Sequence, residues 1–228
     1  MPMTTKPKRK TSTRRGRPRR EDEGDVTARI LEAATDLFLR DGVAATSCEA
    51  VVAQAHVGKA SFYARYAGKD ALFKAVVRNA IDSEALNVHP PAPLGDTPQD
   101  RLAVVGKAVL TQAVSPVPLA LMRLFLTEAR RFPDLIAEVD TMARSRVVDI
   151  LARAVSPDLT DTGPPDRAVA VAERFLDLTF APIMLAALTG HEEAMSASAI
   201  GGRIAFALDT LERTGLLKEL HHDQVKQQ

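Results

Sequence analysis

The sequence predicts an all-α protein of nine helices, and three observations favour this fold class. Hydrophobic residues make up 46% of the 228 residues, which is enough for a sizeable core. Aromatic residues make up only 4% and tryptophan is absent, so the core must be built mainly from Ala, Leu, Val and Ile, a composition that favours helices over strands. Apolar residues also recur at helical spacing, and no convincing strand follows Gln99.

Residues 1–24 are predicted to form a disordered basic arm. Nine of the 30 Lys and Arg residues lie in residues 1–20, which contain no acid, whereas the remaining chain holds 21 basic and 29 acidic residues. A block of like charge repels itself and often binds polyanions; nucleic acid suits this arm best, and an anionic membrane surface is the rival. The arginines of the segment RGRPRR could enter a narrow minor groove or could add only non-specific charge. These arginines are Arg15, Arg17, Arg19 and Arg20.

Four helices are expected in residues 25–87. Their expected bounds are about 26–41, 46 to 54 or 55, 59–66 and 69–86. Gly42 can end the first helix, and Thr46 with Glu49 can form a capping box that begins the second. The second and third helices are short and are joined by a tight turn. Residues 47–66 therefore have the geometry of a helix-turn-helix, whose second helix lies in the major groove of DNA.

The predicted recognition helix carries residues suited to DNA. It has small side chains, Ala60 and Ser61, at the N-terminal end where contact with base edges is expected. Tyr63 can donate its hydroxyl to a phosphate, and Lys69 lies at a helix N-terminus, where backbone N–H groups also favour an anion. The candidate DNA-binding residues are Thr46, Lys59, Ala60, Ser61, Tyr63, Ala64, Arg65 and Lys69.

Five further helices are expected after a proline-rich break at residues 88–98, which we take as a domain boundary. Their expected bounds are about 97–114, a segment that follows Pro116-Val117-Pro118 and ends at 131, then 133–155, 166–188 and 193–214. Prolines near the start of two of these helices are suited to a first helical turn. Residues 216–228 are expected to form a flexible tail.

Three motifs follow one another in residues 26–73. The sequence RILEAATDLFLRDGVAATS is followed by VVAQAHV and then by GKASFYARYAGKDAL. They resemble the DNA-binding domain of the TetR family of transcriptional regulators, in which a similar first helix precedes I-A-x-x-A-G-V and S-K-G-x-L/F-Y-x-x-F-x-x-K-x-x-L. The resemblance implies that Tyr63 and Lys69 hold phosphates and that residues 59–64 face bases. His56 replaces the turn glycine and Gly58 the usual serine, which changes the detail of the operator contacts.

The C-terminal half carries a weaker resemblance. The segment RLFLTEARRFPDL, residues 123–135, is similar to a helix-break-helix in one subgroup of TetR ligand domains. The resemblance implies that residues 97–215 bind an effector and dimerise, with helices at 168–188 and 197–211 forming a four-helix interface between subunits; the alternative for these helices is packing within the chain. Adaptable methionines and aromatic residues could line an apolar effector pocket, although such residues are more often core. The candidates are Met122, Arg123, Phe125, Met142, Phe175, Phe180 and Met184.

The sequence therefore predicts a homodimeric repressor that binds a palindromic operator on double-stranded DNA and is released by a small apolar or amphipathic effector. The alternative is an architectural or effector-independent DNA-binding protein. An enzyme is not expected, and neither is a cofactor or metal, because the sequence has no defensible catalytic triad, metal-ligand cluster or phosphate-binding glycine loop. The single cysteine, Cys48, excludes an internal disulfide. Without a secretory signal or a membrane-length apolar stretch, we expect a cytoplasmic protein with no membrane partner.

Overall fold

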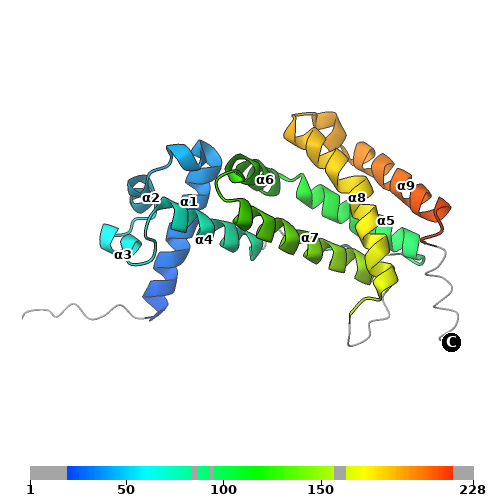
Figure 1. The fold of residues 1–228 in the computed structure, drawn as a ribbon, viewed down its shortest axis with the longest axis horizontal. Coiled ribbons are helices and arrows are strands. Elements are labelled where there is room, and N and C mark those ends of the chain that lie inside the picture. The colour runs from blue at the N-terminus through cyan, green and yellow to red at the C-terminus, as the bar shows by residue number, and fades with distance from the viewer. Residues whose placement is uncertain (1–19, 84–86, 93–94, 157–162, 218–228) are drawn as a thin grey trace, which may run out of the picture.

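The computed structural model describes residues 20–83, 87–92, 95–156 and 163–217, which form nine α-helices and one short 3-10 helix. The helices are α1 (Arg20–Ala45), α2 (Cys48–Gln54), α3 (Lys59–Tyr63), α4 (Lys69–Ile81), α5 (Pro98–Ala113), α6 (Pro116–Glu128), α7 (Pro133–Val155), α8 (Asp166–Leu188) and α9 (Ala197–Arg213), with the 3-10 helix η2 (Glu192–Met195) before α9. The all-α prediction is confirmed. The molecule is elongated: α1–α4 lie at one end, α8 and α9 at the other, and α7 runs between the two ends (Figure 1).

Helix α1 is longer than expected. It begins at Arg20 rather than near Val26, so the last residues of the predicted arm are helical. The other predicted arm arginines, Arg15, Arg17 and Arg19, lie outside the described residues. Gly42 interrupts the helix with φ 82° and ψ 160°, a conformation that glycine adopts without steric cost. The regular part of α1 therefore ends at the predicted position.

The cap of α2 differs from the predicted capping box. The N-cap is Ser47, whose hydroxyl accepts a hydrogen bond from the N–H of Ala50 at 3.1 Å. The hydroxyl of Thr46 points backward and donates to the carbonyl of Gly42 at 2.8 Å. Both residues carry a hydroxyl, and the conformation of the chain after Gly42 decides which one faces the orphan N–H groups of the helix.

The C-terminal helices follow the predicted bounds closely, with two exceptions. One is α6, which spans Pro116–Glu128, whereas the expected helix follows Pro118 and ends at 131. The other is the last helix. Helices α7 and α8 begin and end where the sequence predicts, whereas the expected last helix at 193 is divided into η2 and α9. Gly215, at φ 83°, turns the chain after α9, and Leu217 is then fully buried. The predicted flexible tail is therefore wrong for its first residues; residues 218–228 lie outside the described part of the chain.

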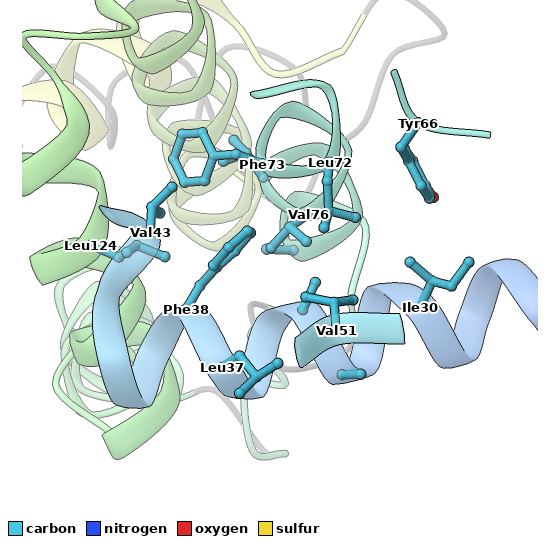
Figure 2. Packing of buried hydrophobic residues seen from close by; sticks show 14 of the residues in the cluster. Ile30, Leu37, Phe38, Val43, Val51, Tyr66, Leu72, Phe73, Val76 and Leu124 are labelled. Atoms are coloured by element: carbon cyan, nitrogen blue, oxygen red, sulfur yellow. The ribbon is translucent and has the colours of Figure 1, made fainter. Parts of the chain in front are cut away.

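Two main hydrophobic cores hold the molecule together, and their boundary does not follow the proline-rich segment. The first joins α1–α4 to residues of α6 and of the N-terminal half of α7. Figure 2 shows this contact, with Leu124 of α6 beside Val43, Phe38 and Phe73. The second core joins α5, α8 and α9 to the C-terminal half of α7. Residues 140–146 of α7, between the two cores, are all exposed. Helix α7 therefore belongs to both halves of the molecule.

Candidate DNA-binding surface

The helix-turn-helix is held on the first core by the apolar face of each short helix. Val51 of α2 and Phe62 of α3 are fully buried. The turn between the helices includes His56, whose φ of 53° places a non-glycine residue in the left-handed region. The guanidinium of Arg29 on α1 donates to the carbonyls of Ala55 and His56, each at 3.4 Å, and so ties α1 to this turn.

The opposite face of α3 is exposed and consists of small side chains around one tyrosine. Lys59, Ala60 and Ala64 are exposed and Ser61 is partly exposed. The side chain of Tyr63 is 48% exposed, and its ring packs edge-on against the buried ring of Phe62, with centroids 5.2 Å apart. A half-exposed tyrosine whose ring packs on a buried phenylalanine suits a phosphate contact at the edge of a groove.

The pKa of Tyr63 supports this use of the hydroxyl. The carboxylate of Glu49 on α2 raises the pKa of Tyr63 above its ordinary value, with a smaller contribution from burial. The phenol therefore remains protonated at physiological pH and remains a hydrogen-bond donor. Burial, and secondly Glu49, also raise the pKa of the Cys48 thiol, which agrees with a structural rather than a reactive cysteine.

Two of the cationic residues predicted to contact DNA form hydrogen bonds to other groups of the chain. Arg65 donates from Nε to the hydroxyl of Thr27 at 3.1 Å and from Nη1 to the carbonyl of Ser61 at 2.9 Å. Lys69 donates from Nζ to the carbonyls of Ala44 and Thr46 at 2.8 and 2.9 Å. Arg65 thus ties α3 to α1, and Lys69 closes the loop between α1 and α2.

Most of the predicted DNA-binding residues are at least partly exposed, but Thr46 is buried. Thr46 is only 4% exposed, and its hydroxyl is already engaged with the carbonyl of Gly42, so it is not a surface contact. Sequence reasoning overlooked Glu49, which is exposed and lies 3.8 Å from the ammonium of Lys59. In the sequence, a glutamate in the first turn of a helix indicates only a cap, and its position beside α3 depends on how α2 packs against α3.

The predicted effector-pocket residues are distributed over several clusters of the structure. Phe125 belongs to the first core, and Phe175 belongs to the second, where it packs so closely on Gly106 that a Cβ there would clash. Met122, Phe180 and Met184 meet in a third, smaller cluster with Leu119 and Ala187. Met142 is exposed on α7, and Arg123 donates to the carbonyl of Ala187 at 3.2 Å. Four of the seven candidates therefore lie at this third cluster, whereas Phe125, Phe175 and Met142 lie elsewhere.

A hollow of about 360 Å³ lies instead between α7 and α8. Its lining consists of Arg144, Ser145, Val148, Asp149, Pro164, Val169 and Glu173, none of which was predicted. Within the described ranges, no three His, Cys, Asp or Glu residues are grouped as metal ligands would be. No single described helix is long and apolar enough to cross a membrane; α5 and α6 reach that length and composition only as a pair, bent by 64°.

Two family models match the chain. Residues 30–76 match "Bacterial regulatory proteins, tetR family", and residues 100–214 match "AefR-like transcriptional repressor, C-terminal domain". The first match spans the helix-turn-helix, and the second spans α5–α9. The two matches together contain nearly all the described helices.

Similar proteins agree with these matches. The chain is 28% identical over 207 residues to the HTH-type transcriptional repressor Rv3405c of Mycobacterium tuberculosis, covering 89% of this chain and 98% of that protein. The fold resembles a TetR-family regulator from Mesorhizobium loti with a TM-score of 0.66 at 16% identity, covering 84% of this chain and 97% of that one. It also resembles the flavonoid-responsive regulator FrrA with a TM-score of 0.61 at 24% identity, covering 83% and 97% of the two chains. From its matched domains and its helix-turn-helix, this chain belongs to the TetR family of DNA-binding transcriptional regulators.

Proposed function

We propose that the protein is a homodimeric repressor that binds a palindromic operator in the cytoplasm and is released from it by a small apolar or amphipathic molecule. The observation that carries this proposal is the exposed face of α3 and of Ala64, which follows it. The side chains of Ala60 and Ala64 are small enough to let the helix approach base edges, and Lys59 and Tyr63 are exposed on the same short segment. Two such helices related by a two-fold axis would read half-sites about one turn apart, roughly 34 Å.

The proposal of a dimer is supported by the exposed faces of α8 and α9. Leu185 is 65% exposed and Phe206 is 54% exposed, although both are large apolar residues. Gly202 lies one helical turn before Phe206 on α9, and nothing within 4 Å occupies the Cβ positions of Gly202 and of the adjacent Gly201. Two copies could therefore bring these helices close together and cover the apolar side chains.

The proposal of effector control is supported by the contacts between the two halves of the molecule. Phe132, at the start of α7, stacks against Phe73 of α4 with centroids 4.9 Å apart, and the guanidinium of Arg131 pairs with Asp70. At the other end of α4, Arg146 of α7 donates to the carbonyl of Ile81 at 2.7 Å. A ligand that shifts α7 would therefore move α4 and with it the spacing of the two recognition helices.

The basic arm would add sequence-independent affinity through phosphates. Each phosphate that it neutralises should steepen the dependence of log K on log salt by about 0.9. Deletion of residues 1–19, which leaves α1 whole, should therefore flatten the salt dependence of DNA binding. An unchanged slope would exclude the arm as a DNA-binding element.

The deciding experiment is fluorescence anisotropy of the purified protein on DNA from upstream of its own gene, compared with scrambled DNA over a salt series. Preference for the native fragment with two chains bound per site is the expected result. Equal binding to both fragments that vanishes with salt would contradict operator recognition and favour an architectural protein. A thermal-shift screen that finds no stabilising ligand would favour an effector-independent protein.

A further inference from the structure

An ion pair lies at the start of the recognition helix and belongs to no predicted contact. Glu49, in the first turn of α2, and Lys59, the first residue of α3, place Oε1 and Nζ 3.8 Å apart. Their side chains are 59% and 67% exposed, so both groups remain accessible from the side on which Tyr63 is also exposed. A negative and a positive group are therefore presented side by side at the end of α3 that enters a major groove first.

The carboxylate of Glu49 gains a little from the dipole of α2, because it lies in the first turn of that helix, but its pairing with Lys59 needs another explanation. An exposed ion pair contributes little to folding, because solvent screens it and both side chains lose freedom. A carboxylate also repels phosphate, so its presence on this surface weakens non-specific binding. Arg65 and Lys69, the other cations of this region, are bonded to groups of the chain itself, which leaves Lys59 and Glu49 as the charged pair at the head of α3.

We propose that Glu49 and Lys59 together read one G·C base pair in each half-site of the operator. The ammonium of Lys59 would donate to O6 and N7 of the guanine, and the carboxylate of Glu49 would accept from the N4 amino group of the paired cytosine. This inference rests on the proposed function, because it requires that α3 lie in the major groove.

The pair fits a G·C edge better than an A·T edge. In the major groove a G·C pair presents two neighbouring acceptors on the guanine and then one donor on the cytosine. An A·T pair places its donor between two acceptors, so lysine would lose its second acceptor or the carboxylate would face the O4 of thymine. Lysine alone would donate to any of these oxygens and nitrogens as well as to phosphate. The carboxylate therefore supplies the discrimination.

The first test is selection of binding sites from a random DNA library by the full chain and by three variants. The wild type should enrich one G·C pair per half-site that Glu49→Met and Lys59→Met no longer require, because methionine offers neither the carboxylate nor the ammonium. Loss of one good base contact should reduce discrimination at that position by about tenfold. Glu49→Met should also bind scrambled DNA more tightly, because a repulsive charge is removed. Glu32→Gln, which neutralises an exposed carboxylate on α1, is the matched control and should select the wild-type site.

The second test changes the base instead of the protein. Replacing the selected cytosine by a pyrimidine that lacks the N4 amino group should weaken wild-type binding about tenfold and should leave Glu49→Ala unaffected. Equal losses for both proteins, or an unchanged base preference for Glu49→Met at every position, would overturn the inference while leaving operator binding intact. A wild type that selects no sequence at all would instead overturn the proposed function, and the inference with it.

Discussion

The hydrogen bonds of single residues in and beside the helix-turn-helix depend on tertiary contacts as well as on local conformation. Lys69 and Arg65 look like DNA contacts in the sequence because they are cations beside a recognition helix. The carbonyls that they bind belong to Ala44, Thr46 and Ser61, and the hydroxyl belongs to Thr27, so three of these four partners come from other elements. Spacing along the chain could not predict those partners, because the fold of α1 onto α4 creates them.

A prediction at this scale concerns His56, which occupies a left-handed backbone conformation at φ 53°. Glycine adopts this conformation without the steric cost that a Cβ imposes, although it gives the unfolded chain more freedom. His56→Gly should therefore raise the free energy of unfolding by about 0.5–1 kcal/mol. Urea unfolding followed by circular dichroism measures the change.

The control for that experiment is Ala53→Gly, in the helical part of α2. The same residue introduced there should lower the free energy of unfolding by about 0.8–1 kcal/mol. If both substitutions destabilise the protein equally, His56 is not under backbone strain.

At the scale of whole elements, the sequence predicts a helix best where its ends carry their own signals. Helices α7 and α8 have the predicted bounds because Pro133 opens one and the loop ending in Pro165 precedes the other. The bounds of α1 and α9 are less exact. No proline or clear cap signal fixes Arg20. Ser196 does cap α9, because its hydroxyl accepts from the N–H of Ala199 at 3.2 Å, but a serine inside an apparently continuous helical pattern does not by itself predict the break between η2 and α9. The predicted effector-pocket residues lie apart for a different reason. Phe125 and Phe175 share an apolar character, but the packing of α6 on α1 assigns them to different cores.

A prediction at the element scale concerns the capping box of α5. The hydroxyl of Thr97 donates to Oδ2 of Asp100 at 2.6 Å, and this bond, followed by the backbone N–H of Thr97, holds the pKa of Asp100 below its ordinary value. A lowered pKa in the folded state means that the ionised carboxylate stabilises the fold above the unfolded pKa of about 3.9. This contribution is lost as the pH falls through the pKa of the folded state. Asp100→Ala should therefore lower the melting temperature at pH 7 and should differ less from the wild type below about pH 4.

Thermal melts of both proteins at a series of pH values between 3 and 7 test this sign. Asp96→Ala removes an exposed carboxylate just before the same helix and serves as the control. A deficit of Asp100→Ala that stays constant down to pH 3 would show that the lost bonds do not depend on ionisation.

At the scale of the whole molecule, the two hydrophobic cores form two packing units that are joined by α7. The first core joins the DNA-binding helices to α6 and to half of α7, so these elements form one packing unit. The second core leaves the outer faces of α8 and α9 exposed at the far end of the molecule (Figure 1). A partner bound at that end can fix the distance between two recognition helices only if α7 transmits its position.

The corresponding prediction concerns Phe206, which is 54% exposed on α9. If two copies meet through α8 and α9, Phe206→Asp places a charge in an apolar interface and should convert the dimer to a monomer. Loss of one half-site contact from each complex should then weaken operator binding by on the order of 100-fold or more. Light scattering after gel filtration gives the mass, and anisotropy gives the affinity. Leu126→Asp is the matched control, because Leu126 is 57% exposed but lies on α6. A Phe206→Asp protein that remains dimeric, or a Leu126→Asp protein that dissociates, would place the interface on another face of the molecule.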